Sequence, residues 1–145
     1  MNPDGKYFRL LGIHLAEFLT IGCHAQKLIG KLTRSNCLAK NNLIYKVLRA
    51  LYFALIHSHL TYCSIILSCL SPSNKNKIFK IQMKAIRLLT NSICNAHTSP
   101  LFSQHHIFTQ DKIIKFGKLK FMRTVFNNYA PKSFENIWQL NGENW

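Results

Sequence analysis

The chain has 145 residues, with 19 lysines and arginines against 5 aspartates and glutamates, and it carries a net charge of +14. The acids are scattered along the sequence, so neighbouring carboxylates cannot assemble the paired-acid or two-metal sites used by many hydrolases. Because 48% of the residues are hydrophobic, one domain with a real core is expected, and intrinsic disorder is not.

The first predicted element is a β-strand over 7–15. Residues 2–6 read Asn-Pro-Asp-Gly-Lys, a strong turn signal, and after them apolar and polar residues fall on alternating faces. The two residues upstream of the turn cannot supply a partner strand, and the rest of the sequence shows no second convincing strand. We therefore expect the first residues to be the edge of a larger sheet that the chain does not contain.

After Thr20 the hydrophobic period becomes helical. The pattern predicts a helix over about 23–39 and a long buried helix over about 43–70. Ser71 and Pro72 supply an N-cap and a first-turn proline for a third helix, which runs to about Thr90.

A short helical turn is expected at Pro100, and Thr109 is predicted to cap a fourth helix that runs to about residue 127. Pro131 begins a tail whose Phe134, Ile137 and Trp138 are expected to dock on the bundle. The predicted fold is mainly α, a bundle of about four helices with a short β-strand or hairpin remnant at the N-terminus.

The stretch 51–70 has the length of a membrane span and contains no charged residue. It is interrupted by histidine, serine, threonine and tyrosine, and its small and polar residues form a narrow helical stripe, as in a helix buried inside a bundle. We favour the buried helix. The alternative is a small basic membrane protein anchored by 51–70.

A row of cations on the third helix is the main candidate site. Lys77, Lys80, Lys84 and Arg87 fall within an arc of about 80°, with apolar residues over most of the remaining surface. No acid lies among them to offset their repulsion, so a bound polyanion would stabilise the row. The alternative is a plain solvated helix face. Lys27, Lys31 and Arg34 repeat the pattern on the first helix and are predicted to support the same site.

The charge makes nucleic acid the first candidate partner and an anionic membrane surface the second. We expect binding to the phosphates of RNA, DNA or an RNA–DNA hybrid. Five cysteines without a CxxC pair indicate reduced thiols, and no secretory signal opens the sequence, so the expected location is intracellular, with the nucleus included.

Catalytic and metal-binding patterns are weak. His59 and Cys63 have the i, i+4 spacing of metal ligands, but no second pair completes a four-ligand set. The glycines never cluster into a phosphate loop, and a Cys/His nucleophile would lack an orienting group. We therefore predict no catalytic residue, no metal site and no cofactor.

Three longer segments and three shorter ones together match the sequence pattern of one known family, in the same order and with similar spacing. The sequence resembles the downstream part of jockey-like non-LTR retrotransposon reverse transcriptases, from about residue 6 to residue 138. The matching segments are 7–15, 51–63, 81–91, 95–102, 118–122 and 130–134.

The resemblance implies a position within that polymerase. Leu10-Leu11-Gly12-Ile13 is similar to the last palm hairpin, so 1–19 correspond to the last palm strands, 20–92 to a thumb-like region, and 93–145 to a connection region and tail. The aspartate pair and its Mg²⁺ would belong to the palm, which this chain lacks. The expected role is therefore non-catalytic and non-specific binding of template-primer backbone, with the palm and fingers as a further partner.

The sequence departs from the family's pattern at two positions. Ala16 stands where an acid is usual, and Ile21 stands where a tryptophan is common. The alternative that these departures raise is a non-functional remnant of such an element.

Overall fold

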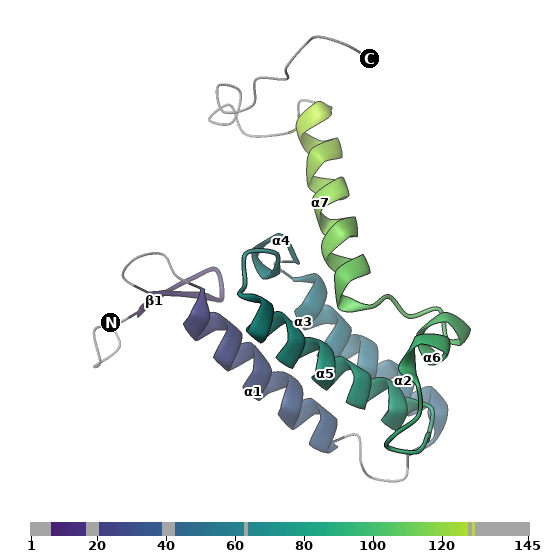
Figure 1. Ribbon diagram of the computed structural model, residues 1–145. Coiled ribbons are helices and arrows are strands. Elements are labelled where there is room, and N and C mark those ends of the chain that lie inside the picture. Colours follow the sequence, from purple (N-terminus) through teal and green to yellow (C-terminus); the bar gives the residue numbers. More distant parts are fainter. Residues whose placement is uncertain (1–6, 17–20, 39–42, 63, 128, 130–145) are drawn as a thin grey trace.

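A computed structural model describes residues 7–16, 21–38, 43–62, 64–127 and 129. Most of these residues are helical, and a two-stranded antiparallel hairpin precedes the helices (Figure 1). The predicted class, mainly α with a β-hairpin remnant at the N-terminus, is confirmed.

The hairpin corrects the prediction of one strand over 7–15. Strand β1 (Tyr7–Leu10) pairs with β2 (Ile13–Ala16), with Leu10 opposite Ile13 and Phe8 opposite Leu15. The chain reverses at Leu11 and Gly12, whose φ angles of 47° and 83° are those of a two-residue hairpin turn. The first strand thus finds its partner within this chain, and an unpaired sheet edge is not needed to explain it.

Two long helices lie side by side and form the front of the bundle (Figure 1). Helix α1 (Gly22–Leu38) and helix α5 (Pro72–Leu89) have the bounds predicted from the sequence to within one residue. The side chain of Ser71 accepts a hydrogen bond from the Asn74 N–H (3.4 Å), so the predicted cap of α5 is confirmed.

The expected long helix over 43–70 is continuous only from Tyr45 to Thr61, and its predicted extension to residue 70 is wrong. Helix α2 (Tyr45–Leu51) runs into a π-helix η1 (Tyr52–His57) and helix α3 (Ser58–Thr61), and helix α4 (Ser64–Leu67) follows separately. The break lies at Tyr62, whose ψ of 124° is extended. Among the described residues, no helix combines the length and apolar character needed to cross a membrane.

The C-terminal part contains helix α6 (Thr98–Gln104) and helix α7 (Gln110–Phe126). The predicted start of α7 at Thr109 is confirmed, but the Thr109 side chain makes no capping hydrogen bond. The first half of α7 packs on the bundle and its second half extends away from it (Figure 1). The predicted docking of Phe134, Ile137 and Trp138 lies outside the described residues.

The core is formed where α1, η1, α3, α4, α5, α6 and the start of α7 meet. Leucine and isoleucine side chains fill most of it. Its most buried large members are Leu32, Leu60, Leu67, Ile78 and Ile86.

Among the described residues two polar side chains, those of Gln110 and Gln82, are fully buried, and the amide of Gln82 has the larger set of hydrogen bonds. Its Nε2 donates to the hydroxyl of Tyr52 (2.9 Å) and to the carbonyl oxygen of Phe108 (2.9 Å), and its Oε1 accepts the N–H of Gln110 (2.8 Å). The amide therefore joins α5 to η1 and to the beginning of α7, and its donors and acceptor are all used.

Gln82→Leu should lower the free energy of unfolding by about 2–4 kcal/mol, because it leaves buried polar groups of three other residues without partners. Urea denaturation followed by circular dichroism measures the change. Gln26→Leu, at an exposed position on α1, is the matched control and should change stability by less than about 0.5 kcal/mol. Equal effects of the two substitutions would contradict the role assigned to Gln82.

Gly117 marks a close approach of α7 to α4. A β-carbon at this position would overlap Ser64 Oγ and lie 3.0 Å from Ser64 Cβ, whereas one at Gly30 in α1 would meet nothing within 4 Å. We expect Gly117→Ala to destabilise the protein by about 1–2 kcal/mol through overpacking. Gly30→Ala should stabilise it by about 0.5–1 kcal/mol, because alanine is the better helix former. The urea midpoint should therefore fall in Gly117→Ala and rise in Gly30→Ala. A higher midpoint in both variants would refute the close contact of Gly117 with Ser64.

Candidate nucleic-acid interface

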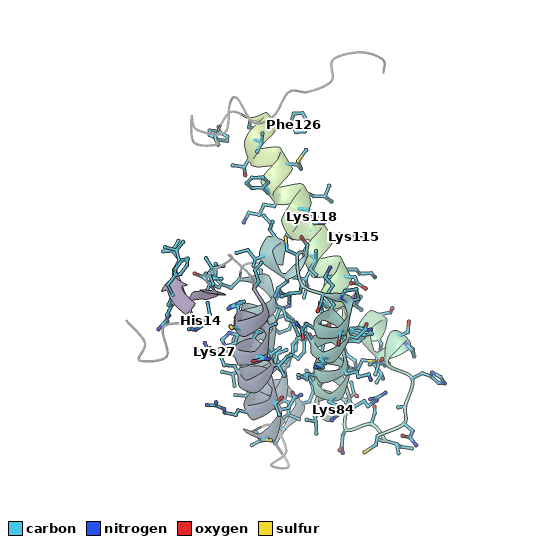
Figure 2. All side chains as sticks on the ribbon, turned by 60° about the vertical axis from the view of Figure 1, so that its left-hand side comes forward. His14, Lys27, Lys84, Lys115, Lys118 and Phe126 are labelled. Atoms are coloured by element: carbon cyan, nitrogen blue, oxygen red, sulfur yellow. The ribbon has the colours of Figure 1, made fainter. Side chains whose placement is uncertain are left out.

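The predicted row on α5 lies on the outer face of the helix. Lys77, Lys80 and Lys84 are exposed, and Figure 2 labels Lys84 on this helix. The buried residues of α5, including Ile78 and Ile86, lie on the other side. We call the three exposed lysines the α5 row.

Arg87, the fourth predicted member, is held differently. Its side chain is half-buried, and its Nε donates a hydrogen bond to the carbonyl oxygen of Ala96 (3.0 Å). Arg87 thereby joins the end of α5 to the loop before α6. It has a structural contact that the other three residues of the row do not show.

The predicted cations of α1, Lys27, Lys31 and Arg34, are also exposed. Asn36 lies about 180° around the helix from Lys27. Its Nδ2 donates to the carbonyl oxygen of Ile81 on α5 (3.0 Å). The α1 cations therefore face away from α5, and the structure places the two predicted sets on different sides of the helix pair.

Lys27 and Lys31 instead line a cleft of about 590 Å³ between the hairpin, α1 and the end of α3. Figure 2 shows His14 of the hairpin beside Lys27 of α1. We call this hollow the basic cleft. Its lining cations and histidines are Arg9, His14, His24, Lys27, Lys31 and His59.

Polar and ring contacts fix the walls of the basic cleft. The Nζ of Lys27 lies 3.3 Å from His14 Nδ1, and the rings of His14 and His24 stack with centroids 6.3 Å apart. The Tyr62 hydroxyl donates to the carbonyl oxygen of Leu11 (2.6 Å), which attaches the hairpin turn to the end of α3. The cleft thus depends on contacts between segments that are far apart in the sequence.

Burial lowers the pKa of His14, His24 and His59, and neighbouring positive groups lower each pKa further. For His14 these neighbours are Lys27, Arg9 and Lys31, and Lys31 also acts on the other two histidines. Asp111, the one acid within the described ranges, is not among the residues that line the cleft. Because these pKa values lie below the ordinary value for histidine, the three imidazoles are neutral near pH 7.

Sequence reasoning missed Arg9 and the three histidines as site residues. Arg9 lies within the strand predicted over 7–15, and His59 was considered only with Cys63 as a pair of metal ligands. Within the described ranges no group of three or more histidine, cysteine or acidic side chains is placed to hold a metal ion, and Cys63 lies outside those ranges. No local signal could have found the cleft, because its residues come together only when the hairpin packs on α1.

No protein-family model, curated protein or solved structure gives a significant match to the chain.

Tyr62→Phe should release the hairpin turn from α3, because it removes the donor to the Leu11 carbonyl. A loss of about 1 kcal/mol would accelerate hydrogen exchange of the paired amides in β1 and β2 roughly fivefold. Mass spectrometry of peptides that cover the hairpin measures this rate. Tyr129→Phe, at an exposed position beyond α7, should leave it unchanged. An unchanged exchange rate in Tyr62→Phe would show that the hydrogen bond from Tyr62 to Leu11 does not hold the hairpin against α3.

Proposed function

We propose that the chain binds the phosphate backbone of RNA, DNA or an RNA–DNA hybrid without sequence preference. The observation that carries this proposal is the α5 row, three exposed lysines on one helix face with no carboxylate beside them. The one acid of the described ranges, Asp111, lies on another helix.

The spacing of the α5 row suits a phosphate chain. Lys77 and Lys84 are separated by about 10 Å along the helix axis. A nucleic-acid strand carries about three phosphates over that distance. Phosphate contacts carry no base information, so this surface would position a strand without reading its sequence. The cations of α1 face another side and would contact a second part of the ligand.

We further propose that the chain corresponds to the thumb and connection part of a retrotransposon reverse transcriptase. The resemblance supports this assignment, and so does the hairpin over 7–16 that precedes the helices. The chain would then hold template and primer, and nucleotidyl transfer would belong to a separate palm. An upstream open frame with a Tyr- or Phe-Ala-Asp-Asp box would support this assignment, and its absence at the intact genomic locus would oppose it.

Replacing Lys77, Lys80 and Lys84 together by Gln should weaken binding to a labelled RNA–DNA duplex by roughly tenfold or more at low salt. It should also reduce the slope of log affinity against log salt by about three, one for each lost phosphate contact. Fluorescence anisotropy at several salt concentrations measures both quantities.

The matched control replaces Lys112, Lys115 and Lys118 of α7 by Gln. It removes the same charge from exposed positions, two of which are labelled in Figure 2, and should weaken binding less. A wild-type affinity that does not respond to salt would reject backbone binding. If the two triple variants lost the same affinity, the α5 row would be rejected as the binding site. Binding would then depend only on the net charge of the protein.

A further inference from the structure

The outer face of α7 carries an exposed stripe with the spacing of a helix–helix contact. We propose that this stripe docks a helix of a partner protein whose apolar residues are bordered by aspartate and glutamate. We call it the α7 seam, and its members in chain order are Lys112, Phe116, Leu119, Arg123 and Phe126. The inference does not depend on the α5 row.

Spacing is the first argument. Successive members of the α7 seam are four, three, four and three residues apart, which is the repeat of the positions that face the partner in a coiled coil. This repeat places the five side chains within an arc of about 80° and extends them over about 21 Å of the helix axis. A second helix of about two heptads could therefore lie along the whole stripe.

Exposure is the second argument. Ile113 and Ile114 are buried against the bundle, whereas the apolar members of the α7 seam lie on the other side of the helix. Phe116, Leu119 and Phe126 are 59%, 68% and 58% exposed. The second half of α7 extends away from the bundle (Figure 1), and Figure 2 labels Phe126 at its end. Burial of these three side chains against a partner would recover the free energy that their exposure costs.

Charge selects the partner. Lys112 and Arg123 belong to the α7 seam, Lys115 and Lys120 border it on its two sides, and all four are exposed. Within the described ranges no hydrogen bond or ion pair engages these four side chains, and Asp111, the acid of this helix, lies about 100° around it from Lys112. Charged residues in and beside a coiled-coil seam choose the partner through ion pairs. These cations therefore fit a helix that presents carboxylates at the facing positions.

The same cations disfavour the other occupants of such a stripe. In a second copy of this chain, the four cations of one α7 would meet the four of the other, and each chain carries a net charge of +14. A single nucleic-acid strand would be held by bases stacked on aromatic rings, and Leu119 at the centre of the seam offers no ring.

The probe for the test is a synthetic helical peptide of about three heptads, with leucine at its seam positions, glutamate at the positions that border the seam, and alanine elsewhere. Its control peptide has lysine in place of every glutamate. In calorimetric titrations of the full chain, the acidic peptide should bind at least tenfold more tightly than the lysine peptide. Its affinity should decrease as the salt concentration rises.

Leu119→Ala/Phe126→Ala should weaken binding of the acidic peptide at least tenfold, because the apolar contacts at the centre and end of the seam are lost. The matched control, Ile44→Ala/Ile93→Ala, removes two apolar side chains that are exposed elsewhere and should change the affinity by less than about twofold. All four side chains are exposed, so both variants should keep the wild-type circular dichroism spectrum.

Lys112→Gln/Lys115→Gln/Arg123→Gln should weaken binding of the acidic peptide at least fivefold. The triple variant of the α5 row loses the same charge from another helix and should change this affinity by less than about twofold. Because the α5 variant tests nucleic-acid binding and the α7 variants test helix binding, failure of one proposal can be told apart from failure of the other.

Equal binding of the two peptides, or no binding of either, would overturn the proposal, and so would equal losses in the two triple variants or in the two double variants. Sedimentation that shows a wild-type dimer, dissociated by Leu119→Ala/Phe126→Ala, would overturn it in favour of a second copy. A single-stranded RNA whose binding is lost in the same double variant, with no binding of the acidic peptide, would overturn it in favour of nucleic acid.

Discussion

The arrangement of the bundle depends on the buried amide of Gln82. An apolar residue could fill the same space, but it could not specify the rotation of α5, because dispersion contacts have little directional preference. Three hydrogen bonds to Tyr52, Phe108 and Gln110 fix that rotation. Burial raises the pKa of the Tyr52 hydroxyl to about 12, although its hydrogen bond with Gln82 acts in the opposite direction, so this partner stays a neutral phenol. With Gln82 turned inward, helix geometry turns Lys77, Lys80 and Lys84 outward.

Local signals predicted α1 and α5 well. Ser71 and Pro72 define the start of α5, and the apolar period continues until Leu89, so both ends could be found without tertiary information. Periodicity alone could not distinguish the hairpin from one strand, since a period of two continues through its short turn. The break at Tyr62 was missed for a different reason. The Tyr62 hydroxyl bonds to Leu11, 51 residues earlier, and a contact at that separation leaves no periodic trace in the sequence.

The candidate sites divide in the same way. The α5 row was predictable because all its members belong to one helix, and only the hydrogen bond of Arg87 to Ala96 required the structure. The basic cleft draws on strand, helix and helix end, and periodicity within any one segment says nothing about the others. Lys27 and Lys31 were selected as companions of the α5 row. The contact of Asn36 with Ile81 instead turns them toward Arg9 and His14.

This separation of charge has a physical consequence for the fold. Cations on different sides of the α1–α5 pair repel each other less than they would on one surface, because their separation is greater and solvent screens them. Inside the basic cleft, burial and the charges of Lys27, Arg9 and Lys31 lower the pKa of His14. Packing of the hairpin on α1 therefore favours the neutral form of this imidazole, and protonation of His14 would oppose that packing.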